Sequence, residues 1–91
     1  MRNPGYVHSA PELAIEVLSP GNTRLERAEK LKDYESIGVP EVWVISPEAL
    51  TVEVLLLKDG KLTTEALLRQ GTLRPSHFPN AAIEIEAIWP K

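Results

Sequence analysis

The chain has 91 residues, of which 43% are hydrophobic and 25% charged, and its formal net charge is -3 at pH 7. It contains no cysteine, which excludes disulfides and cysteine-ligated zinc, and the acidic balance counts against strong non-specific binding to nucleic acid. No apolar stretch approaches the roughly 20 residues that span a bilayer, and residues 1–5 lack the apolar core of a signal peptide, so we expect residues 1–91 to form one cytoplasmic domain with no membrane partner.

The first half of the sequence predicts a strand, a helix and a second strand. Residues 12–19 are mostly apolar and stop at a Pro-Gly-Asn turn, which is typical of a strand. Residues 24–37 contain no Gly, no Pro and one β-branched residue, and Gly38 is a natural residue to end a helix. Residues 41–46 then predict the next strand. Two apolar strands joined by a helix form a βαβ unit, whose strands are parallel.

The second half predicts a β-hairpin and then less regular chain. Residues 51–58 are rich in strand-forming residues, Asp59-Gly60 is a strong two-residue turn signal, and residues 61–69 return as the second strand. Residues 71–79 form an irregular connector, and residues 82–89 alternate as a half-buried strand or a short extended edge. The pattern predicts an α/β fold, or α+β by a stricter definition, with a mixed sheet and a helix on at least one face.

Glu16 is the most informative residue, because it lies inside the apolar run of residues 13–18. A buried, ionised carboxylate without a partner would cost several kcal/mol. We therefore expect a cation, a metal ion or a hydrogen-bond network to offset that cost. Strand periodicity places Glu12 on the same face as Glu16, but about 13 Å away at roughly 3.3 Å per residue. Both carboxylates cannot then bind one ion directly, and Glu12 lies at the entrance to the strand.

The predicted helix has a solvated side and an apolar side, at about 100° per residue. The solvated side carries Glu26, Glu29, Asp33 and Ser36, and the apolar side carries Leu31, Tyr34 and Ile37. Arg27 and Lys30 lie within the apolar arc, so one of them could meet the carboxylate of Glu16. The alternative is that both extend past the edge of the sheet to water. We expect Glu53, Glu84 and Glu86 to be ordinary outward-facing strand residues.

Three sequence blocks follow one another at a specific spacing. They are residues 11–20 (PELAIEVLSP), Glu29-Lys30-Leu31 with Tyr34, and residues 38–45 (GVPEVWVI). These blocks resemble the Uma-two family, bacterial proteins classed as restriction-endonuclease-like nucleases, and the resemblance covers nearly the whole chain. It implies the PD-(D/E)XK nuclease fold. Because the upstream half of the family domain, with its first metal-binding Asp, has no counterpart in residues 1–11, the chain resembles the C-terminal half of that domain.

The resemblance also implies an activity, namely magnesium-dependent hydrolysis of phosphodiester bonds in DNA. In that fold a metal ion, usually magnesium, is held by acidic residues on neighbouring strands, and a lysine assists the attacking water. Carried over to this chain, the metal ligands are Glu16 and Glu12, the latter in place of the family's Asp. The lysine is Lys30, displaced from the strand to the helix, and Tyr34 shapes the pocket.

The sequence is also compatible with two further functions. One is a non-catalytic, split or degenerate remnant that acts as a homodimer or binds a complementary chain, because an uncovered sheet edge should bind a partner. The other is a regulatory module that binds DNA or protein, although the acidic balance disfavours the DNA version.

Overall fold

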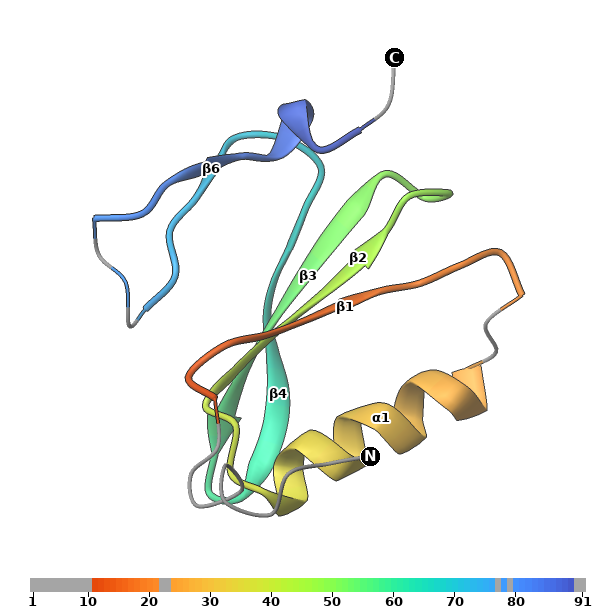
Figure 1. Ribbon diagram of the computed structural model, residues 1–91, viewed down its shortest axis with the longest axis vertical. Coiled ribbons are helices and arrows are strands. Elements are labelled where there is room, and N and C mark those ends of the chain that lie inside the picture. Colours follow the sequence, from red (N-terminus) through yellow and green to blue (C-terminus); the bar gives the residue numbers. More distant parts are fainter. Residues whose placement is uncertain (1–10, 22–23, 77, 79, 90–91) are drawn as a thin grey trace, which may run out of the picture.

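The computed structural model describes residues 11–21, 24–76, 78 and 80–89. In chain order the elements are β1 (Ala14–Val17), α1 (Arg24–Ser36), β2 (Glu41–Ser46), β3 (Thr51–Lys58), β4 (Lys61–Leu68), β5 (Thr72–Leu73), β6 (Ile83–Glu84) and the short 3-10 helix η2 (Ile85–Ala87). Four strands form the main sheet in the order β1-β2-β3-β4, and β5 pairs with β6 in a separate sheet (Figure 1). In the described part of the chain, no helix is long and apolar enough to span a bilayer.

The main sheet is mixed, as the sequence predicted. β1 and β2 are parallel and are joined by α1, which confirms the βαβ unit. β2 pairs with β3, and β3 with β4, in antiparallel fashion. The helix lies on one side of the sheet, and the segment carrying β5, β6 and η2 lies toward the other (Figure 1). The predicted α+β architecture is therefore correct.

The sheet separates two apolar clusters. The cluster on the helix side contains the buried residues Ala14, Val39, Val42, Val44 and Leu55, with Leu31 and Tyr34 of α1 packed against it. The cluster on the opposite side contains Trp43, Ile45, Val52, Val54, Leu73 and Ile85. Successive residues of β2 point alternately into the two clusters. Both faces of β2 are therefore buried, which explains why its sequence is a continuous apolar run.

Local turn chemistry fixes two of the connections. Gly38 follows α1 with a φ of 79°, the left-handed conformation that commonly ends helices and that suits glycine. In the hairpin, Asp59 and Gly60 have φ angles of 51° and 79°. Two successive positive φ angles characterise the type I′ turn, whose twist matches that of the flanking strands.

A β-bulge interrupts the pairing of β3 with β4. Glu53 lies opposite Leu67, whereas Leu55 lies opposite Thr64, so the register shifts between Val54 and Leu55. The extra residue reverses the alternation of β4, since two residues then oppose one. As a result Thr64 comes to the same side of the sheet as Glu53, the side that α1 covers.

The structure corrects several expectations. β1 spans only residues 14–17 rather than 12–19, and its face away from α1 is open, with Ile15 49% and Val17 57% exposed. The expected connector over residues 71–79 contains β5. Residues 82–89 form a two-residue strand followed by η2, not a single strand. The chain turns at Ile85 because that side chain is fully buried and its N–H bonds to the carbonyl of Gly71 at 2.9 Å.

Candidate functional site

The carboxylate of Glu16 is the centre of the candidate site. One oxygen, Oε1, accepts a 2.8 Å hydrogen bond from the hydroxyl of Tyr34. The other, Oε2, lies 3.4 Å from the ammonium nitrogen of Lys30. The side chain of Glu16 is 18% exposed and that of Lys30 is 54% exposed. The carboxylate is thus sheltered on the strand, while the cation that neutralises it stays open to solvent.

Two regular elements create this meeting. In β1, Ala14 and Glu16 share the face toward α1, because successive strand residues alternate. In α1, Lys30 and Tyr34 are four residues apart and therefore lie on one side of the helix. The expected contact between the carboxylate and an inward-pointing basic residue is confirmed. The alternative, in which Lys30 extends past the sheet without a partner, is wrong.

The environment of Tyr34 keeps its hydroxyl protonated. Burial, followed by the hydrogen bond to Glu16 and the negative charges of Glu16 and Asp33, raises the pKa of Tyr34 from 10.0 to about 12. A phenol with this pKa carries no charge at neutral pH. Tyr34 can therefore donate a hydrogen bond at the site but cannot accept a proton as a base.

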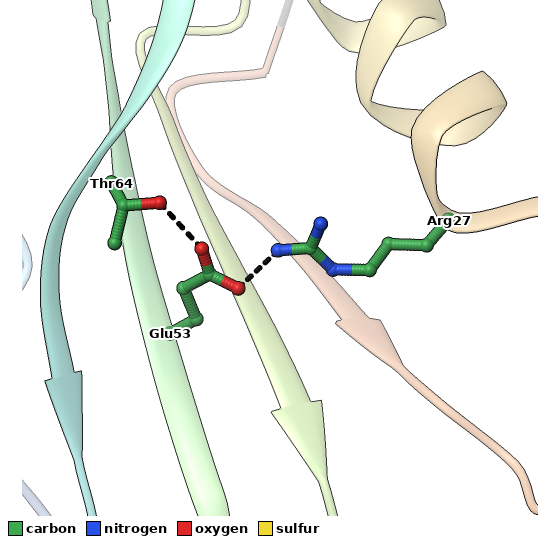
Figure 2. A network of polar contacts seen from close by, with 3 residues as sticks. All are labelled: Arg27, Glu53 and Thr64. Carbon is green, nitrogen blue, oxygen red and sulfur yellow. Dashed lines mark hydrogen bonds and ion pairs between the residues drawn. The ribbon is translucent and has the colours of Figure 1, made fainter. Parts of the chain in front are cut away.

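A second polar network lies beside the first. The guanidinium of Arg27 forms an ion pair with Oε1 of Glu53, and the hydroxyl of Thr64 donates to Oε2 of the same carboxylate (Figure 2). Glu16 and Glu53 both pair with Val44, one from each neighbouring strand, so the two carboxylates share one row of the sheet. The expectation that Glu53 faces outward is wrong, and so is the alternative that Arg27 reaches water without a partner.

Sequence reasoning also missed Glu41, which is 2% exposed. Its Oε2 accepts a 2.8 Å bond from the indole N–H of Trp43, and its Oε1 accepts a 2.9 Å bond from the backbone N–H of Ser76. The Glu-x-Trp spacing could have predicted the contact between Glu41 and Trp43. A buried indole N–H needs an acceptor, and residues two apart share a strand face. Glu41 joins the start of β2 to the chain that follows β5, and it lies in the core away from Glu16.

The described residues contain only part of a metal site. No three His, Cys, Asp or Glu side chains among them are grouped so that they could hold an ion. Glu12 is exposed and lies before β1. Its role as a second metal ligand stays a prediction. Magnesium prefers oxygen ligands and is usually bound through one or two carboxylates, with waters and substrate phosphates completing its shell. Glu16 fits one position of such a shell.

Comparisons with known proteins identify a family and a related fold. A family profile described as "Uma2: Putative restriction endonuclease" matches residues 2–86. A crystal structure of "a putative nuclease belonging to DUF820" from Anabaena variabilis ATCC 29413 matches with a TM-score of 0.71 and 21% identity, over 89% of this chain and 45% of that one. This likeness shows the fold, and the chain spans less than half of that nuclease. No curated protein matches the chain.

Proposed function

Because the chain belongs to the Uma2 family, of restriction-endonuclease type, we propose that Glu16, Lys30 and Tyr34 form part of the active site of a magnesium-dependent DNA endonuclease. The observation that carries the proposal is the convergence of the three side chains, with Tyr34 at 2.8 Å and Lys30 at 3.4 Å from the two oxygens of Glu16. A carboxylate, a cation and a neutral donor are the groups that phosphodiester hydrolysis uses.

Each side chain has a distinct role in the proposed reaction. Lys30 is half exposed, so its ammonium can contact a phosphate oxygen and stabilise the negative charge that develops there. Tyr34 stays protonated, donates a hydrogen bond and holds the carboxylate of Glu16 in place. Glu16 in turn orients the ammonium of Lys30 at the solvent-facing side of the site.

Magnesium is a proposal that the donor chemistry of Glu16 supports. When bound, the ion would polarise the phosphoryl group and activate water. Glu16 would supply one carboxylate oxygen, and Glu12 would lie at the entrance to the site, too far along the strand to bind the same ion directly. Since the chain spans 45% of the nuclease it matches, we propose that the remaining ligands come from a second chain or from a protein segment beyond residues 1–91.

Magnesium binding can be tested without any nuclease activity. We expect titration with millimolar magnesium to shift the backbone amide signals of residues 14–18 in NMR spectra. The same titration of Glu16→Gln should leave them unchanged, because an amide is a poor magnesium ligand. Glu65→Gln is the matched control, since Glu65 is an exposed β4 residue paired with Lys58. Equal shifts in all three proteins, or none in the wild type, would contradict the metal site.

Cleavage of plasmid DNA tests the catalytic assignment. We expect Lys30→Ala to abolish magnesium-dependent nicking while lowering the free energy of unfolding by less than about 1 kcal/mol, because ion pairs open to solvent contribute little to stability. Lys32→Ala, a change of the same charge at an exposed position on α1, should keep wild-type activity. Retention of full nicking activity by Lys30→Ala would exclude this lysine from catalysis.

A second candidate function is partner binding without catalysis. The observation that favours it is the open face of β1, a strand at the edge of the sheet, where Ile15 and Val17 are both about half exposed. Edge strands with exposed apolar side chains readily pair with another chain. Sedimentation should then show a dimer that Val17→Lys dissociates, whereas Leu67→Lys on the opposite edge strand should not. A monomer at all concentrations would contradict this function.

A further inference from the structure

Polar contacts, rather than a buried apolar stripe, attach α1 to the sheet. The helix contains no buried residue. Its apolar contacts come from Leu31 and Tyr34 in its second half, whereas Leu25 near its start is 69% exposed. A carboxylate oxygen of Glu35 also accepts a 2.6 Å bond from the backbone N–H of Leu62. The second half of α1 thus packs against the sheet and is hydrogen-bonded to it, whereas among the described contacts the first half has no apolar packing on the sheet.

The Arg27–Glu53 ion pair is the attachment nearest the start of the helix among the described contacts. Arg27 is 31% exposed and Glu53 is 20% exposed, so water reaches this pair less freely than it reaches Lys30. The hydroxyl of Thr64 donates a hydrogen bond to the second carboxylate oxygen of Glu53 (Figure 2). The acceptor for Arg27 is therefore held in one orientation on a central strand of the sheet.

The two ion pairs of α1 are geometrically linked. Arg27 and Lys30 are three residues apart and lie on the same side of the helix, about 4.5 Å apart along its axis. Their partners, Glu53 and Glu16, stand in one row of the sheet on either side of Val44. Two basic residues of the helix thus form ion pairs with two acidic residues of the sheet. Fixing one pair limits how far the helix can rotate or shift at the other.

We propose that Arg27 and Glu53 are positioning residues, whose ion pair holds the first half of α1 against the sheet so that Lys30 reaches Glu16. Without it, the first half of the helix separates from the sheet while Leu31, Tyr34 and Glu35 retain the second half. The catalytic consequence rests on the function proposed above, but the effect on helix position does not. Glu53 is then part of the support of the site, although it lies two strands from Glu16.

Spin-label distances test helix position directly. The chain has no cysteine, so Leu25→Cys on α1 and Thr63→Cys on β4, both at exposed positions, can be labelled specifically. We expect a single narrow distance distribution in the parent protein. Arg27→Ala should shift and broaden it, and Arg27→Lys, which keeps the charge, should restore most of the parent distribution. Lys32→Ala, with the same loss of charge on α1, should leave it unchanged.

A second variant distinguishes loss of the ion pair from unfolding of the protein. Glu53→Gln keeps the size of the side chain and its bond to Thr64 but removes the charge that attracts Arg27, so it should broaden the distribution in the same way. Identical distributions for Arg27→Ala, Glu53→Gln and Lys32→Ala would overturn the proposal. If Arg27→Ala moves the helix but magnesium perturbs no variant near Glu16, the positioning role stands and the endonuclease function fails.

Discussion

The hydroxyl of Tyr34 donates a 2.8 Å hydrogen bond to the carboxylate of Glu16, which lies 18 positions earlier in the sequence. The bond joins the second half of α1 to the edge strand β1, and Lys30 occupies the other oxygen of the same carboxylate. One acidic side chain therefore holds two groups from one side of the helix. A change in any of the three side chains should affect the other two.

Replacing Tyr34 with Phe should lower the free energy of unfolding by about 0.5–1.5 kcal/mol, the usual net contribution of one hydrogen bond. The cost stays small because Lys30 and the solvent reaching Glu16 still satisfy the carboxylate. Urea unfolding followed by tryptophan fluorescence measures it. Ser36→Ala is the control, since this exposed hydroxyl donates to the carbonyl of Asp33 in its own helix. An equal loss in both variants would remove any special role for the Tyr34 bond.

Tyr34 should also make the stability of the protein depend on alkaline pH. Its pKa in the folded protein is about 12, raised from 10.0, so the folded state retains the proton that the unfolded state releases. The stabilisation is complete below pH 10 and is lost as the pH rises through 12. The free energy of unfolding of the wild type should therefore fall more steeply across this range than that of Tyr34→Phe. Parallel curves for the two proteins would contradict the assigned environment.

The sequence predicts the parts of the fold that local chemistry determines. β2, β3 and the Asp59-Gly60 hairpin occur where strand-forming residues and turn signals place them. The helix ends before Gly38 because a left-handed residue is needed there. Glu16 could be assigned a partner because a charge inside an apolar run requires one.

The environment of Glu53 could not be predicted, because it depends on long-range register. The side of the sheet that Glu53 occupies follows from its pairing with Val44, and the approach of Thr64 follows from the β-bulge in β4. A single inserted residue changes this arrangement without leaving a clear sequence signal. β5 could not be predicted either, because a two-residue strand is too short to show a periodicity in the sequence.

Glu41→Gln should lower the free energy of unfolding by about 1–3 kcal/mol, because the amide group of Gln turns a donor toward one of the two N–H groups that the buried carboxylate accepts from. Those groups belong to Trp43 and Ser76, and both carboxylate oxygens of Glu41 accept from them. Urea unfolding measures the loss, and the exposed Glu65→Gln is the control. A change in Glu41→Gln no larger than in Glu65→Gln would show that the two bonds contribute nothing.

Gly60→Ala should lower the free energy of unfolding by about 1 kcal/mol, the cost of a side chain in the left-handed region. Gly60 has a φ of 79°, and no atom lies within 4 Å of the added Cβ, so the effect comes from the backbone and not from a clash. Gly21→Ala is the matched control: its Cβ also meets nothing within 4 Å, and its φ lies outside the left-handed region. Thermal unfolding of both variants measures the difference. If Gly21→Ala destabilises the protein as much as Gly60→Ala does, the turn geometry is not the cause.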